Sequence, residues 1–359
     1  MDIAHTDNSA LLRRVGPGDW LFALALAGGA AFALRQYGGF MDIYEKLILV
    51  LTVPAIAAIG WAWKPFRLFL AVSTALALAS ISLYQGDLAR AEKVFFLKYL
   101  ISSQTAIMWM SALVFIATGA YWLGLLARSD FAEKTGSALT WSAATMGTTG
   151  LLVRWYESYL IGTDVGHIPI SNLYEVFVLF SLITALLYLY YEGRYATRRM
   201  GAFVLLVISA AVAFLLWYTF SREAQEIQPL IPALQSYWMK VHVPANFIGY
   251  GAFALAAMVA FAYLIQRQAD ETRWWKLAPL GALGLVLCFE PIVFRSAKLS
   301  TSASYWAVYF GVSLLIALLL NFLPTVAWPG VPAHSEATAR FPVGTGPRRL
   351  FDAHRNPSA

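Results

Sequence analysis

Apolar stretches of about 20 residues recur along the chain and are separated by short polar segments. That length is what an α-helix needs to cross the hydrocarbon core of a bilayer. The pattern predicts an all-α, polytopic helical membrane protein with about ten transmembrane helices. The ten spans are expected at 19–37, 44–63, 66–84, 102–126, 136–154, 172–191, 200–219, 244–266, 275–294 and 304–323.

Two prolines and one short segment modify this pattern. Pro54 falls inside the second expected span and Pro291 near the end of the ninth, and both are expected to kink helices that neighbouring helices support. The segment 97–104 is either an interfacial helix or an extension of the fourth span.

The two ends of the chain are expected to lie outside the membrane. Residues 1–18 are polar and lack the features of a cleaved signal peptide, so they are expected to form a cytoplasmic tail before the membrane domain at 19–323. Residues 324–359 hold six of the 15 prolines and have no apolar periodicity, which predicts a disordered cytoplasmic tail. His334 and His354 are expected to be solvated there.

Basic residues in short loops predict the orientation. Arginine and lysine gather in the 191–199 and 266–276 loops, whereas the 155–171 and 220–243 loops hold few. Loops rich in lysine and arginine stay in the cytoplasm. With ten spans, both termini are then cytoplasmic and the two poorly basic loops face outward. The bias is weak at 85–98, whose basic residues would also face out.

Composition supports a membrane protein and excludes other classes. The chain is 59% hydrophobic and 13% charged, whereas soluble domains have about 25% charged residues. The net charge of +6 is scattered over many loops, so it is read as membrane topology and no nucleic-acid partner is expected. Cys288 is the only cysteine, which excludes an internal disulfide, a CxxC pair and a cysteine zinc site.

Two polar segments carry the candidate chemistry: GHIPISNLYE at 166–175 and KVHVPANFIGY at 240–250. Each places a histidine two residues before a proline at the edge of an apolar run. A histidine at the membrane boundary can be neutral, which makes it a usable metal ligand.

His242 is the stronger candidate. Pro244 is a favourable first residue for the eighth span, which would place the imidazole at the outer rim of that helix. An imidazole beside aromatic rings suits haem iron and the edge of its macrocycle, but an ordinary interfacial belt of Trp and Tyr looks the same. The aromatic residues expected nearby are Trp217, Tyr218, Tyr237 and Trp238.

His167 is a weaker ligand candidate and could equally shape the outer vestibule. Ser171 or Asn172 is expected to cap the sixth span, with Glu175 in its first turn, where a carboxylate is favoured by the helix dipole. Capping is therefore an alternative to cofactor binding for Asn172 and Glu175.

Few other ionisable residues fall inside the expected spans, and those that do are near helix ends, from which they can reach the interface. A charge at mid-helix costs about 3 kcal/mol, so an ion-coupled transporter would show deliberate intramembrane charges. Their absence argues against such a transporter, and the lack of a Gly-Lys-Ser loop argues against ATP hydrolysis. The residues near helix ends are Arg35, Glu45, Lys46, Arg67, Arg154 and Glu290.

Three blocks of sequence resemble one known family. RWYESYLIGTDVGHIPISNLYEVFVLF at 154–180 and WYTFSREAQEIQPLIPALQSYWMKVHVPANFIGYGAFALAAMVAFAYL at 217–264 carry the similarity, which continues less distinctively through WWKLAPLGALGLVLCFEPIVFR at 274–295. They are similar to the haem-handling membrane proteins of System II cytochrome c biogenesis, the CcsA/ResC type, often labelled CcsB. The resemblance covers roughly 100–320.

The resemblance implies a function and a set of residues. His242 matches the family's first external haem-ligating histidine, and Asn172, Tyr174 and Glu175 match its SNxYE signature. Such proteins export haem b, bound transiently, and present it reduced to the CxxCH motif of apocytochrome c. They do so at the outer face of the bacterial inner membrane with a ResB-like partner, as a possible part of a cytochrome c haem lyase. No catalytic residue is assigned. The cofactor-binding candidates are His242, as metal ligand, with His167, Trp238, Trp217, Asn172 and Glu175.

The sequence also departs from the family. The WGxxWxWD segment expected after the ninth span is missing, as are the second external histidine and the membrane histidine beyond it. We hypothesise a truncated or frame-altered family member. Two other classes stay open: a non-catalytic remnant that attaches no haem, and an unrelated multi-span carrier or lipid-facing scaffold whose histidines are interfacial.

Overall fold

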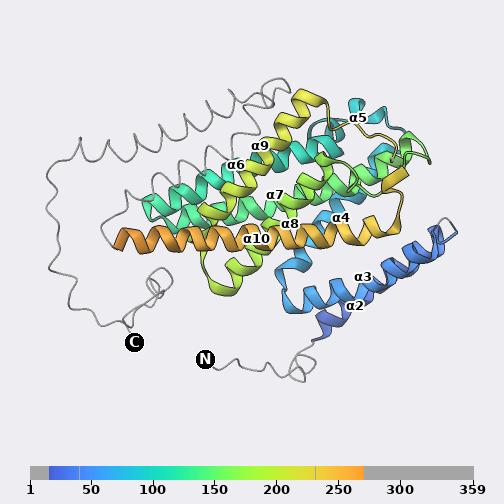
Figure 1. Ribbon diagram of the computed structural model, residues 1–359. Helices are drawn as coiled ribbons and strands as arrows, with labels where there is room; N and C mark the ends of the chain where they lie inside the picture. Colours follow the sequence, from blue (N-terminus) through green and yellow to red (C-terminus); the bar gives the residue numbers. More distant parts are fainter. Residues whose placement is uncertain (1–15, 40, 231, 271–359) are drawn as a thin grey trace, which may run out of the picture. The chain divides into compact units, whose positions relative to one another are not determined.

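The computed structural model describes residues 16–39, 41–230 and 232–270, and these residues form helices joined by short loops (Figure 1). The longer elements are α2 (Pro17–Tyr37), α3 (Ile43–Ala62), α4 (Pro65–Tyr84), α6 (Ser103–Ala127), α7 (Asp130–Ile161), α8 (Leu173–Tyr195), α9 (Gly201–Arg222) and α10 (Tyr237–Asp270). The shorter ones are α5 (Arg90–Lys93), the π-helical turn η1 (Leu97–Ile101), and the 3₁₀ turns η2 (Arg198–Met200) and η3 (Pro232–Leu234).

The all-helical membrane fold predicted from the sequence is confirmed. Within the described residues, seven helices are long and apolar enough to cross a membrane, and they correspond to seven of the eight spans expected there. The eighth expected span, 136–154, corresponds to α7, which is 32 residues long but more polar than the seven. The expected spans at 275–294 and 304–323, and the tail at 324–359, lie outside the described residues.

The chain divides into two compact units. The first takes its described residues from Met1–Leu113, Trp141–Leu182 and Gln225–Phe247. The second takes them from Val114–Thr140, Ile183–Ala224 and Ile248–Ala359. Helices α6, α7, α8 and α10 contribute residues to both units, and both candidate histidines belong to the first.

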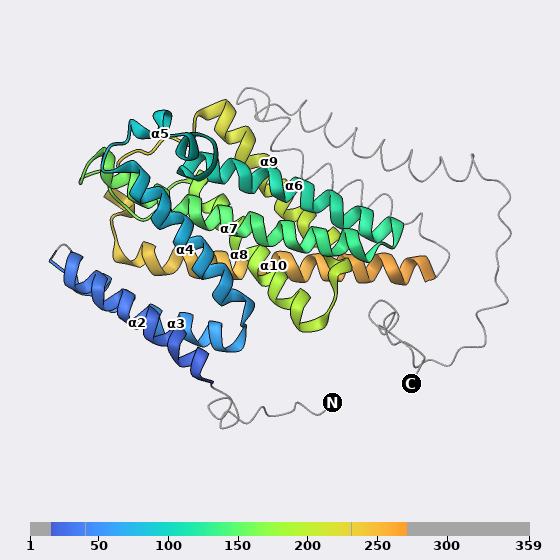
Figure 2. The same ribbon diagram turned by 180° about the vertical axis from the view of Figure 1, so that it is seen from behind.

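In the first unit, α2 and α3 run side by side as a hairpin (Figure 1, Figure 2). Helix α3 begins with a reciprocal cap: the amide of Glu45 donates to Asp42 Oδ1 (2.6 Å), and the amide of Asp42 donates to Glu45 Oε2 (3.1 Å). Such a capping box satisfies amides that have no partner within the helix. Pro54 lies inside α3, as expected.

Helix α7 extends well beyond the expected end of its span at residue 154. Two charged residues, Arg154 and Glu157, lie at and just beyond that expected end. In the structure Glu157 is buried, where it accepts hydrogen bonds from the hydroxyls of Tyr84 and Ser103 and from the Ser103 amide (3.0 Å). Since these donors satisfy the carboxylate inside the protein, α7 continues to Ile161.

Two other expected boundaries are also corrected. The eighth span was expected to begin at Pro244, but α10 begins at Tyr237 and contains Pro244. The start at Tyr237 follows from Ser236, whose hydroxyl and carbonyl accept the amides of Trp238 (3.3 Å) and Met239 (3.1 Å). The 97–104 segment is not a continuous extension of the fourth span: η1 is a separate short helix that ends at extended Ser102, and α6 begins at Ser103.

The second unit packs around a buried tyrosine. The Tyr121 hydroxyl donates to Glu192 Oε2 (2.6 Å), and Ser137 donates to the other carboxylate oxygen (2.6 Å). A Cβ atom on Gly201 would lie 2.5 Å from the Tyr121 ring and 2.6 Å from the Tyr188 hydroxyl oxygen. Helix α9 can therefore begin against this cluster because Gly201 has no side chain.

We expect Gly201→Ala to lower the thermal unfolding temperature of the detergent-purified protein, because overpacking a close-packed core costs about 1–3 kcal/mol. Gly193→Ala is the matched control, since a Cβ at that helical position in the same unit meets nothing within 4 Å. Equal unfolding temperatures for the two variants would contradict the packing shown here.

Candidate functional site

His242 lies in the second turn of α10 with its side chain exposed. Its Nε2 atom accepts a hydrogen bond from the side-chain amide of Asn246, one turn later (2.9 Å). Trp238, one turn earlier, is 63% exposed. Residues four apart share a helix face, so α10 presents an accessible imidazole next to an accessible indole.

The opposite side of the same turn attaches α10 to α3. Lys240 forms an ion pair with Glu45, and the ring of Tyr237 stacks on Tyr44 with centroids 4.0 Å apart and planes 3° apart. Met239 is buried. These contacts set the rotation of α10 about its axis, so the face that bears His242 points away from α3.

Trp217 is not part of this arrangement within the first unit. It belongs to the second unit, where its ring stacks on Tyr218 and packs at a tilt against Phe214. The aromatic neighbours of His242 in its own unit are therefore Trp238 and Tyr237, whose ring centroids lie 5.4 Å apart.

His167 is half-buried, and the protein engages both of its ring nitrogens. Nδ1 lies 2.6 Å from the carbonyl oxygen of Val165 and therefore carries a proton, while Nε2 lies 2.7 Å from the hydroxyl oxygen of Ser171. Its backbone amide donates to Ser158 (3.2 Å). Among the described residues no hydrogen bond or ring contact joins His167 to His242. The arrangement fits the supporting role considered from the sequence better than that of a free ligand.

The expected cap of the sixth span is confirmed, and Asn172 provides it. Asn172 Oδ1 accepts the amide of Glu175 (2.8 Å), while Glu175 Oε2 accepts the amide of Asn172 (3.4 Å). The same carboxylate oxygen accepts the amide (2.8 Å) and the hydroxyl (2.9 Å) of Ser171. Asn172 and Glu175 thus fix the loop that carries His167 onto the start of α8.

Arg154 was expected to reach the membrane interface, and this was wrong: its side chain is 2% exposed. Its Nε donates to Glu175 Oε1 (2.8 Å), and its terminal nitrogens donate to the carbonyl oxygens of Gln225 (2.7 Å) and Glu226 (3.3 Å). The guanidinium also lies over the Tyr174 ring, 5.1 Å from its centroid. Burial is tolerated because a carboxylate and two carbonyls replace water around the guanidinium.

One sequence signal could have revealed this buried charge. Arg154 and Glu157 lie three residues apart and so share a face of α7. In addition, α7 is less apolar than any of the other long helices in the described part of the chain. A charged pair on one face of a helix in a membrane protein marks the side that faces other helices.

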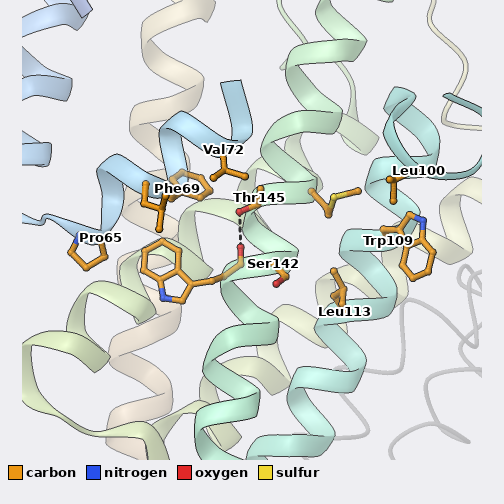
Figure 3. A pocket seen from close by; sticks show the side chains of 11 residues that line it. Pro65, Phe69, Val72, Leu100, Trp109, Leu113, Ser142 and Thr145 are labelled. Carbon is orange, nitrogen blue, oxygen red and sulfur yellow. Dashed lines mark hydrogen bonds between the residues drawn. The ribbon is translucent and has the colours of Figure 1, made fainter. Parts of the chain in front are cut away.

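An apolar cavity of about 580 Å³ lies in the first unit between α4, η1, α6 and α7 (Figure 3). Trp109, Trp141 and Phe69 line it with aliphatic side chains. Thr145, one of its few polar lining residues, donates to the Trp141 carbonyl of its own helix (2.9 Å). No histidine lines this cavity, and the described residues contain no cluster of three or more potential metal ligands from His, Cys, Asp and Glu.

Comparison with known families gives one match. The model of the cytochrome c assembly protein family matches residues 170–313. This segment of the chain is therefore similar to the cytochrome c assembly proteins. The match includes His242, Trp238 and the Asn172–Glu175 cap, and it begins after His167 and Arg154.

Several curated proteins are similar to part of the chain. The chain is 34% identical over 188 residues to the cytochrome c biogenesis protein CcsA of Chlorella vulgaris, covering 52% of this chain and 57% of that protein. It is 33% identical over 156 residues to CcsA of Gloeobacter violaceus (43% and 44%), and 31% identical over 206 residues to CcsA of Synechococcus sp. strain CC9311 (53% and 65%). The chain thus spans about half the length of the curated relatives that it matches. No solved structure matches it.

Proposed function

We propose that this chain is a cytochrome c assembly protein that binds haem b transiently at the outer face of the membrane and presents it for attachment to apocytochrome c. The observation that carries the proposal is the accessible imidazole of His242 beside the accessible indole of Trp238, inside the segment that matches the family. Histidine is a common axial ligand of haem iron.

The residues of this face fit haem as a cargo. The Nε2 atom of His242 is engaged by the neutral amide of Asn246, so a ligand can displace that hydrogen bond without leaving a buried charge unpaired. Trp238 offers a flat apolar surface for the edge of a macrocycle. Haem supplies the iron that takes an axial nitrogen and the vinyl groups that form thioethers with the CxxCH cysteines.

The orientation and the partners belong to the same proposal. The few basic residues in the loops before α8 and α10 favour an outer location for both histidines. The proposal includes a bacterial inner membrane, a ResB-like partner and an apocytochrome c, which the similarity to cytochrome c assembly proteins supports. Membrane lipid contacts the remaining apolar surface of the helices.

The absorbance spectrum of the purified protein tests the proposal. Protein expressed in haem-replete cells is expected to show a Soret band, and reconstitution with a ResB-like partner and an apocytochrome is expected to yield covalent haem. Colourless protein despite an ample haem supply would favour a carrier or scaffold with interfacial histidines. Bound haem without covalent transfer would limit the protein to haem binding.

A further inference from the structure

We infer that Arg154 is a positioning residue that holds the outer segment leading into α10, and through it the face that bears His242. This rests on the proposed function of His242. Arg154 lies on α7, and its two terminal nitrogens donate to the successive carbonyl oxygens of Gln225 and Glu226. These residues begin the segment Gln225–Ser236, which precedes α10 in the chain and is described except at residue 231.

This segment has few other attachments. In the described part of the chain the other hydrogen bonds of this segment are local. The Gln235 amide donates to Pro232 (3.2 Å), its side chain donates to Leu230 (3.0 Å), and Ser236 accepts the amides at the start of α10. The two bonds from Arg154 go to backbone carbonyls, which carry no full negative charge. They therefore depend on the shape of the guanidinium and not on its charge alone. Only a planar, forked donor reaches a carboxylate and two carbonyls at once.

The same guanidinium also holds the polar segment at 166–175, which ends at Glu175. Its partner Glu175 accepts the Arg154 Nε on one oxygen and holds Ser171 and Asn172 with the other. Ser171 in turn contacts the ring of His167. The buried ion pair of Arg154 and Glu175, with side chains 2% and 1% exposed, therefore fixes two segments to α7 and α8. They are the segment before α10 and the segment at 166–175.

The variant Arg154→Lys tests the contacts of Arg154 with the two carbonyls separately from its ion pair with Glu175. Lysine keeps the positive charge beside Glu175, but its ammonium cannot also reach both carbonyls. Glu157→Gln is the matched control, because Glu157 is buried one turn along α7 and bonds to Tyr84 and Ser103, not to the outer segments.

A spin label reports the outer segment directly. It is attached at Gln228→Cys, an exposed position, in a Cys288→Ser background that removes the only native cysteine. In Arg154→Lys we expect the label to become more mobile by electron paramagnetic resonance, and haem occupancy per folded protein to fall about tenfold, as for other residues that orient a metal ligand. In Glu157→Gln both are expected to match the parent.

A label as immobile in Arg154→Lys as in the parent would overturn the inference, and so would an equal change in Glu157→Gln. Full haem occupancy with a mobile label would overturn the link to His242. If the parent protein binds no haem, the proposed function fails, but the label still decides whether Arg154 holds the segment.

Discussion

His242→Ala is expected to abolish the Soret band of the purified protein while leaving its thermal unfolding temperature nearly unchanged. Substituting a residue that only orients a metal ligand lowers metal affinity by about 10–100-fold. Removing the ligand itself should lower haem affinity by at least as much. The side chain is exposed and its hydrogen bond goes only to Asn246. Exposed substitutions of this kind change stability by about 0.5 kcal/mol or less, so lost colour would not reflect unfolding. Absorbance per mole of folded protein is the measurement.

Two further variants make this result specific. Asn246→Ala removes the hydrogen-bond partner but keeps the imidazole, so it is expected to retain the Soret band. His242→Gly is expected to regain colour when free imidazole is added, because an exposed site can admit the replacement ligand. Colour that persists in His242→Ala would assign the iron to another ligand and contradict the proposed site.

The apolar runs predicted the helices well because crossing a membrane imposes a length and a composition that can be read from sequence alone. The boundaries that failed depended on partners far away in the chain. The end of α7 required Glu157 to meet Tyr84 and Ser103, 73 and 54 residues earlier. The start of α10 was wrongly assigned to Pro244 because proline is a stronger helix-start signal than the Ser236 cap that acts in the structure.

The candidate site was predictable only in part. His242 and Trp238 could be selected as candidates because they lie in a polar segment at the edge of an apolar run. Their place on one helix face was not predicted, because the helix was expected to begin only at Pro244. The capping role of Asn172 and Glu175 was also readable, since it is local. Arg154 was misplaced because its partners lie 21 and 71 residues away. The charged Glu157 three residues later was the sequence signal that could have indicated a buried position for Arg154.

Glu175→Ala is expected to cause one of the largest losses of stability of any single substitution in the first unit. It removes the carboxylate that faces Arg154 and leaves a guanidinium that is 2% exposed without a counter-charge. Breaking a buried ion pair by removing one partner costs about 3–5 kcal/mol. The variant also loses the acceptor for Ser171 and Asn172 at the start of α8. Thermal unfolding in detergent, followed by circular dichroism, measures the effect.

Glu175→Gln and the double variant Arg154→Met/Glu175→Gln identify the cause. Glutamine keeps an acceptor oxygen for the cap but not the charge, so Glu175→Gln should fall between the parent and Glu175→Ala. In the double variant no charge remains buried, and because replacing both partners of a buried pair is often close to neutral, it should unfold at a higher temperature than Glu175→Ala. If instead the double variant is the least stable, the carbonyl contacts of Arg154 contribute more to stability than its ion pair. The outer segment would then be a structural part of the first unit and not only the approach to His242.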